Sequence, residues 1–187
     1  MNIITHFFIG WNAGLRYNRQ LRDTLILTAA SVMPDLDGLG ALADLVRGGE
    51  AEFFSAYHHK FGHCGLFCLL LIPAVYWLSR RSWRLVAWFV AIFHLHLLCD
   101  LVGARGPDGY QWPVYYLWPF SDAGFTWSGQ WHINAWPNIL LTTLLVADFL
   151  RQSARVGFTP LLIVSRGADR VLVTTLQNRL GGQNEPE

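Results

Sequence analysis

Charged residues and cysteines are scarce in this sequence, and the two shortages exclude several classes of protein. Charged residues make up 14% of the 187 residues, whereas an ordinary soluble domain has roughly 25%. The formal net charge is +1 and no run of Lys or Arg forms a basic stripe, so we expect no nucleic-acid partner. Because charge is scarce while hydrophobic residues reach 52%, the composition favours a membrane protein.

Cysteine chemistry is not expected either. Cys64, Cys68 and Cys99 are the only cysteines, they form no CxxC pair, and each lies in an apolar run where a thiol behaves as a small buried hydrophobe. The N-terminus has no basic region followed by a small-residue cleavage site, so we expect no secretory signal peptide. Membrane insertion would then use the helices of the folded chain.

Apolar runs and turn signals predict an all-α fold, a polytopic membrane bundle of about five helices with a metal site at one end. The first two runs have 13 residues each, whereas a plain membrane span needs about 20, so the number of crossings is left open between three and five. A buried soluble core is the alternative. The predicted helices cover residues 3–15, 21–33, 65–78, 85–102 and 133–150.

The predicted domain organisation is a membrane helical metal-binding domain over residues 1–155 and a C-terminal amphipathic tail over 156–187. Pro34 is expected to end the second helix, and Pro73 to kink the third. The aromatic, Pro- and Gly-rich stretch 103–131 is expected to be a loop that covers one end of the bundle.

Basic residues segregate when the chain is made to reverse direction at each predicted helix. Only Arg47, Lys60 and Arg105 fall on one side, and the positive-inside rule makes the other, arginine-rich side cytoplasmic. We therefore expect a multi-pass inner-membrane protein whose His and Asp residues lie at the non-cytoplasmic end. The cytoplasmic set is Arg16, Arg19, Arg22, Arg80, Arg81, Arg84, Arg151 and Arg155.

Two carboxylate-containing patterns indicate a metal site. His96 and Asp100 are four residues apart, so one helix face carries both, and an ionisable Asp100 within an apolar helix needs a partner or an ion. Asp35 and Asp37 flank Leu36 after a proline. If that backbone is extended, both carboxylates point the same way.

The histidine-rich segment is less decisive. His58 and His63 are five residues apart, which suits one ion only if His58 lies in a loop and His63 opens the next helix. His59 competes with His58 as the candidate ligand. His94 is two residues from His96, so we expect it to pack or hydrogen-bond on another face of the helix.

The mixture of imidazole and carboxylate groups favours zinc, with Mn²⁺ or Fe²⁺ as alternatives, over Ca²⁺ or Mg²⁺. Seven candidate ligands exceed one tetrahedral set, so one ion with supporting partners or two ions are both compatible with the sequence. The candidate ligands are His6, Asp35, Asp37, His58, His63, His96 and Asp100.

Candidate catalytic residues are Asp35, Asp100 and His132, the last as a proton donor or an added ligand. Lys60 and Arg105 fall on the same predicted side and would neutralise a phosphate, although ordinary surface charges are the simpler interpretation.

Five short motifs, taken in order, resemble the YdjM-like family of membrane-bound metal-dependent hydrolases. They are Thr5-His6, Pro34-Asp35-Leu36-Asp37, the segment from His58 to Cys64, His96 to Asp100, and Leu117 to Phe120. The family's usual His-Arg-Gly-x-Thr-His-Ser segment matches here at its two outer histidines, while its Thr and Ser are absent. The family is distantly similar to zinc-dependent phospholipase C, and this implies a phosphoester substrate.

The sequence and the resemblance together predict a membrane-bound hydrolase that attacks a phosphoester, such as a phospholipid, with a metal-activated water. Membrane lipid is the expected partner. The alternatives are a non-catalytic metal-binding membrane protein and a soluble or peripheral phospholipase-C-like enzyme.

Overall fold

The computed structural model describes residues 1–48, 52–106 and 108–180, and within these residues it contains helices but no strand. The predicted all-α fold is confirmed. Five helices correspond to the five predicted ones, with ends that differ by at most six residues. They are α1 (Ile3–Tyr17), α2 (Leu21–Val32), α5 (Gly65–Leu78), α6 (Trp83–Gly103) and α7 (Trp136–Val156).

Shorter helices fill the connections. Between α2 and α5, a 3₁₀ segment, η1 (Met33–Leu39), runs into α3 (Gly40–Arg47), and α4 (Glu52–Tyr57) follows. After α7 come the 3₁₀ turn η2 (Pro160–Ile163) and α8 (Arg166–Leu180). Residues 181–187 of the predicted tail lie outside the described residues, and the division into domains stays a prediction.

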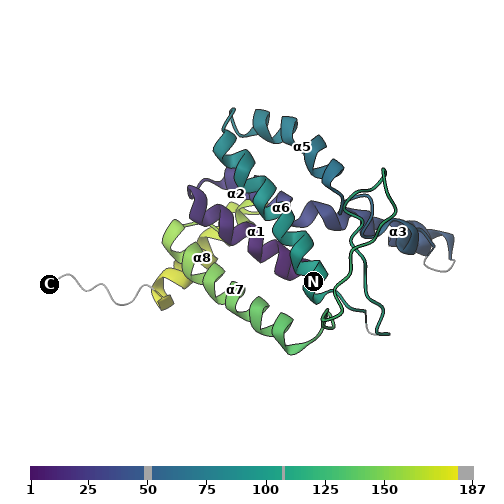
Figure 1. Ribbon diagram of the computed structural model, residues 1–187. Helices are drawn as coiled ribbons and strands as arrows, with labels where there is room; N and C mark the ends of the chain where they lie inside the picture. Colours follow the sequence, from purple (N-terminus) through teal and green to yellow (C-terminus); the bar gives the residue numbers. More distant parts are fainter. Residues whose placement is uncertain (49–51, 107, 181–187) are drawn as a thin grey trace.

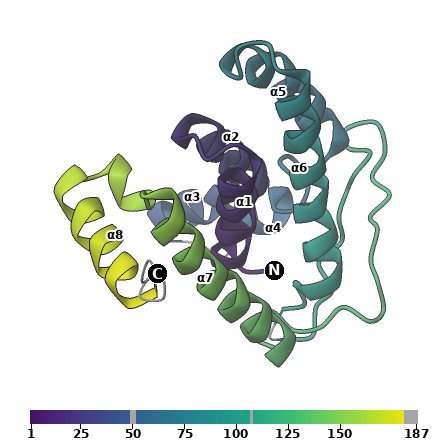
Figure 2. The same ribbon diagram turned by 90° about the vertical axis from the view of Figure 1, so that its left-hand side faces the viewer.

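Helix α1 lies in the middle of the bundle. It packs on α2 and α7, while α6 packs on α2 and α5, and α8 contacts α7 and η2 on the outside. Figures 1 and 2 show α5 and α6 on one side of α1, and α7 with α8 on the other. The long connection between α6 and α7, residues 104–135, runs along one end of the bundle (Figure 1) and is called the capping loop below.

Two glycines bring α1 and α2 into close contact. A Cβ atom on Gly10 would lie 2.6 Å from the Cα of Thr28, and one on Gly14 would lie 2.4 Å from the Cα of Thr24. Small residues four apart allow helix backbones to approach in this way, a common device in membrane helices. Asn2 caps the start of α1 by accepting a hydrogen bond from the Thr5 N–H at 2.9 Å. The helix therefore begins at Ile3, and His6 lies buried near its start.

Buried apolar residues form two clusters. The larger lies between α2, α5 and α6 and includes Leu27, Phe89 and Phe93. The smaller joins α1 to α7 and the segment after it through Trp11 and Phe149. Together they fix α1, α2 and α6, the helices that carry or adjoin the polar cluster described below.

Apolar side chains also cover much of the outside, as expected of helices in lipid. Leu70 is 68% exposed and Trp77 75% exposed, both on α5. Two helical stretches, Leu21–Arg47 and Trp83–Gly103, are long and apolar enough to cross a membrane.

The predicted basic side corresponds to one end of the bundle, which we call the arginine end: the ends of α1, α5 and α7 and the starts of α2 and α6. Contacts hold these ends together. The Arg84 guanidinium lies over the Tyr17 ring, 5.3 Å from its centroid, and Arg16 pairs with Asp148 on α7 at 2.6 Å. The capping loop lies at the opposite end.

The capping loop closes the C-terminus of α6. The buried side chain of Gln130 donates to the Asp100 carbonyl oxygen at 2.9 Å, and the Trp131 backbone N–H donates to the Val102 carbonyl at 2.9 Å. Just after the loop, Asn138 of α7 donates to the Gly103 carbonyl at 2.9 Å. These donors satisfy carbonyl groups that a helix end leaves free, and they hold the last turn of α6 in place.

Candidate metal centre

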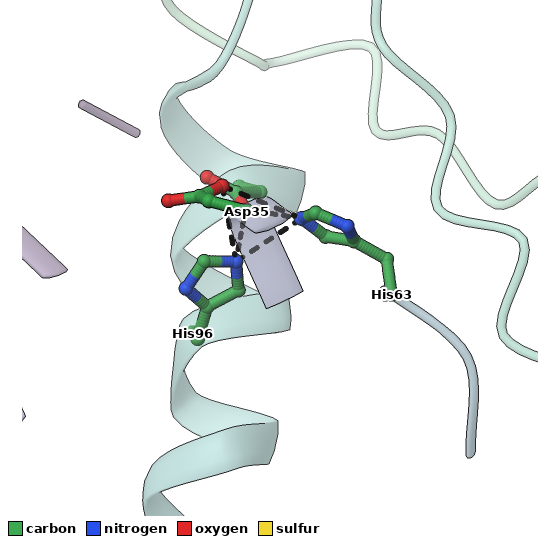
Figure 3. A group of neighbouring side chains, drawn as sticks. Asp35, His63 and His96 are labelled. Atoms are coloured by element: carbon green, nitrogen blue, oxygen red, sulfur yellow. Dashed lines mark hydrogen bonds and ion pairs between the residues drawn. The ribbon is translucent and has the colours of Figure 1, made fainter. Parts of the chain in front are cut away.

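Four side chains converge where α2, α6 and the start of α5 meet below the capping loop. They are Asp35 of η1, His63 of the turn before α5, and His96 and Asp100 of α6, and one ligand atom from each lies within 4.8 Å of all the others. Figure 3 shows the imidazoles of His63 and His96 pointing toward Asp35 from two directions. Three separate parts of the chain therefore meet at one point.

The spacing fits a single ion. Asp100 Oδ2 lies 2.9 Å from His96 Nε2 and 3.2 Å from His63 Nε2, and the two Nε2 atoms are 3.1 Å apart. Asp35 Oδ1 lies 3.6 Å from His96 Nε2 and 3.7 Å from His63 Nε2. Ligands about 2.0–2.1 Å from a tetrahedral zinc are separated by about 3.3–3.4 Å, and the observed distances bracket that value.

Hydrogen bonds at the other ring nitrogens aim both histidines. His96 Nδ1 lies 2.9 Å from the Ser31 carbonyl oxygen, which only accepts, so Nδ1 carries the proton. His63 Nδ1 lies 2.9 Å from Asp37 Oδ2. Each imidazole is thus left with Nε2 facing the same point, the arrangement that metal-binding histidines adopt when carboxylate and carbonyl groups orient them.

Burial favours positive charge at this point, supplied by a proton or by a metal ion. The side chains of His63 and His96 are fully buried, and that of Asp100 is 1% exposed. Two nitrogen lone pairs and a carboxylate that face one another without water repel, and a metal ion removes that repulsion. The donor set therefore fits an ion on its own chemistry.

Asp35 differs from the other three. Its side chain is 14% exposed, its distances to the imidazoles are the longest of the set, and its second oxygen, Oδ2, is buried without a hydrogen-bond partner. Asp35 is therefore the one member of the group whose side chain is partly exposed, although its Oδ2 is itself buried.

The electrostatics of His63 follow from its two carboxylate neighbours. Burial alone would lower the pKa of His63, but hydrogen bonds to Asp100 and Asp37 outweigh it and raise the pKa to about 9. A proton is thus held where an ion would bind, and the two compete.

Asp37 lies outside the four-residue group and orients His63 through its Nδ1 atom. Besides His63 it accepts hydrogen bonds from His58 Nδ1 at 2.8 Å and from the Gly62 N–H at 3.1 Å. The backbone at Asp35 and Asp37 is not extended, as the prediction that both carboxylates point the same way requires, because Pro34 stands in the first turn of a 3₁₀ helix that continues to Leu39. Residues two apart on such a helix point in different directions. Asp35 therefore faces the four-residue group, whereas Asp37 faces the Nδ1 atoms of His58 and His63.

A glycine sets the position of His63. A Cβ atom on Gly62 would lie 2.0 Å from the Pro34 carbonyl oxygen, so only glycine lets the histidine turn approach η1 this closely. At this position the resembled family segment has Thr, and here the backbone N–H of Gly62 supplies the hydrogen bond to Asp37.

His6 reaches the cluster from α1. Its Nε2 lies 3.0 Å from Asp100 Oδ1, its ring packs against His96 with centroids 3.8 Å apart, and its Nδ1 is buried without a partner. The α-amino group of Met1 also contacts Asp100 Oδ1. Asp100 therefore has one oxygen toward His63 and His96 and the other toward His6.

The remaining histidines lie outside the four-residue group. His59 is buried, has φ of 65° and stacks on His63 with ring centroids 4.3 Å apart. His94 Nδ1 lies 2.8 Å from the Val90 carbonyl oxygen and its Nε2 lies 2.9 Å from the Tyr116 hydroxyl. His94 therefore forms hydrogen bonds outside the group, as its spacing from His96 predicts. His132 donates from Nδ1 to the Gly106 carbonyl at 3.0 Å in the capping loop.

Of the seven predicted ligands, the structure brings Asp35, His63, His96 and Asp100 together and places His6, Asp37 and His58 at hydrogen-bond distance from them or from one another. Sequence reasoning did not identify Ser31, Gly62 or Gln130. A glycine directly before a candidate ligand was the one available signal, because glycine marks close approaches of the backbone.

Comparison with known families gives a match over most of the chain. The family model described as the YdjM inner membrane protein matches residues 1–176. This chain belongs to the YdjM family. No curated protein and no solved structure matches it. Family membership and the two candidate spanning helices support a membrane location for this YdjM protein.

Proposed function

We propose that this YdjM protein is a metal-dependent hydrolase of the inner membrane that cleaves phosphoesters, with membrane phospholipid as the favoured substrate. One observation carries the proposal: His63, His96 and Asp100 are buried and close together, whereas the Asp35 side chain is partly exposed and lies farther from the two imidazoles. Catalytic zinc sites characteristically have three protein ligands and one open position.

His63, His96 and Asp100 would hold the ion through Nε2, Nε2 and Oδ2. A bound zinc supplies Lewis acidity and lowers the pKa of water to about 7. Asp37 and the Ser31 carbonyl keep the two imidazoles in the metal-binding tautomer, and Asp35 accepts the proton of the attacking water at the exposed edge.

A second ion is compatible with the same residues. Asp100 Oδ1 and His6 Nε2 face each other at 3.0 Å, and these two groups would help to hold a second ion. We propose occupancy by one or two zinc ions, and metal analysis of the purified protein decides the number.

Groups of the capping end are assigned supporting roles. Arg105 has a buried, unpartnered Nε, and the Lys60 ammonium lies 4.9 Å from the centroid of the Tyr115 ring. We assign them to neutralising the substrate phosphate, and His132 to donating a proton to the leaving group.

A non-catalytic metal site is the second candidate, because four protein ligands also describe a closed structural site. Under that alternative Asp35 completes the coordination and the ion stabilises the bundle. Asp35→Asn separates the two. In the hydrolase it keeps its metal and loses turnover, whereas in a structural site it loses metal and unfolds at lower temperature.

The main experiment combines metal analysis with hydrolysis assays. Purified protein is assayed for release of phosphate or diacylglycerol from phospholipid, and for cleavage of a generic phosphodiester, with and without chelator. We expect His96→Ala and Asp100→Asn to lose the metal and to lower turnover by at least about a hundredfold. His94→Ala, two residues from His96 on α6 but outside the four-residue group, is the matched control and should keep both. Equal turnover of parent and Asp100→Asn, with or without chelator, rejects the hydrolase.

A further inference from the structure

A polar cleft of about 430 Å³ lies at the arginine end, between α8 and the end of α7. Arg166, Arg170, Thr174 and Gln177 line it, and their spacing of four, four and three residues puts them on one face of α8. The cleft lies at the end of the bundle opposite the metal centre.

The two arginines carry unbalanced charge. Neither Arg166 nor Arg170 forms an ion pair with another described residue. Asp169 also lines the cleft, but its Oδ1 accepts hydrogen bonds from the N–H and the hydroxyl of Thr159, both at 2.7 Å. Asp169 thus holds the turn before α8, and the cleft has a surplus of positive charge.

The surrounding arginine end strengthens this charge. Its other acids are engaged, since Asp23 pairs with Arg22 and Asp148 pairs with Arg16. Arg151 and Arg155 near the end of α7 form no ion pair with a described residue. The charge at this end is therefore complementary to an anionic surface.

Exposed apolar residues stand immediately beside the cleft. Ile163 at the end of η2 is 57% exposed and Val164, the next residue, is 86% exposed; they lie three and two residues before Arg166. An apolar projection next to basic side chains is the pattern of an interfacial anchor, where apolar groups enter the acyl region and arginines contact phosphates. A free anion or an acidic peptide would not require the apolar part.

We propose that the corner from η2 to α8 binds the headgroup of an anionic phospholipid, with Arg166 and Arg170 on the phosphate, the Thr174 hydroxyl beside it, and Ile163 and Val164 in the acyl layer. The site is separate from the metal centre and does not depend on hydrolysis. It anchors α8 and the end of α7 on the anionic inner leaflet.

Native mass spectrometry of the full chain tests this, after reconstitution in nanodiscs of phosphatidylcholine with or without phosphatidylglycerol. We expect the parent to retain phosphatidylglycerol in preference to phosphatidylcholine. Arg166→Gln/Arg170→Gln should retain about tenfold less, since each arginine near an anionic surface contributes to binding. Arg151→Gln/Arg179→Gln removes the same charge outside the cleft, so it measures the general attraction of the arginine end, and it should retain several-fold more phosphatidylglycerol than the cleft variant.

Three results overturn the proposal: equal retention of the two lipids, equal loss in both double variants, or displacement of the lipid by millimolar inorganic phosphate, which would assign the cleft to a soluble anion. The metal content of each variant is measured in parallel. Because all four arginines are remote from the metal centre, it should not change, so failure here leaves the proposed hydrolase untouched.

Discussion

Among single residues, His63 determines how the metal centre responds to pH. Its pKa is raised to about 9 without an ion, so near neutral pH the imidazole is protonated, and an ion must displace that proton to bind Nε2. The sign follows directly: apparent metal affinity increases as pH rises toward about 9 and falls as pH is lowered. Acid therefore releases the ion by returning a proton to His63.

Calorimetric titration of zinc into metal-free protein, in two buffers of different ionisation enthalpy, measures this exchange. At about pH 7 we expect about one proton to be released for each ion bound at His63. His94→Ala should release the same number, because His94 hydrogen-bonds elsewhere. Binding at neutral pH without proton release would contradict the assignment of His63 as a ligand.

Individual residues also show which parts of the site a sequence reveals. His96 and Asp100 were predicted to share a face because both lie within one helix, where spacing determines direction. Asp35 and Asp37 were placed together incorrectly, since the 3₁₀ conformation after Pro34 sends them to different partners. The position of His63 depends on the contact between Gly62 and Pro34, a tertiary contact whose local signal is the glycine alone and does not name the partner.

At the scale of elements, the approach of α1 to α2 supports the metal centre. Helix α1 carries His6, α2 leads into Asp35 and supplies the Ser31 carbonyl that orients His96, and the Ser31 hydroxyl donates to the His6 carbonyl at 2.5 Å. Long helices could be located from apolar runs and prolines. The glycine contact between α1 and α2 could not be predicted in this way, because it depends on how the two helices pack against each other.

Gly14→Ala tests this contact. A Cβ atom there would lie 2.4 Å from Thr24 Cα, so the helices must separate, and overpacking of this kind lowers the free energy of unfolding by about 1–3 kcal/mol. Denaturant unfolding in detergent should show the loss, and metal should leave the protein at lower denaturant concentration. Ile4→Ala on the same helix changes a side chain that is 56% exposed and should have little effect. A fully stable Gly14→Ala protein would mean that the helices are not in close contact.

On the scale of the whole molecule, the bundle is polarised, with arginines at one end and the metal centre beneath the capping loop at the other. The helices alternate in direction between these ends, as a multi-pass protein requires, although α1, α2 and α5 are shorter than the roughly 20 residues of a plain span. We propose that the arginine end is cytoplasmic and that the metal centre is on the non-cytoplasmic side.

Labelling with a membrane-impermeant thiol reagent tests this orientation. Asp122→Cys lies in the capping loop and Asn178→Cys on α8, both at exposed positions, and the parent supplies the background because Cys64 and Cys68 are buried and Cys99 is partly buried. Spheroplasts should be labelled at residue 122 and inverted vesicles at residue 178. Labelling of both from the same side would mean that α7 does not cross the membrane. The opposite pattern would put the metal centre on the cytoplasmic side, where its substrate would come from the inner leaflet.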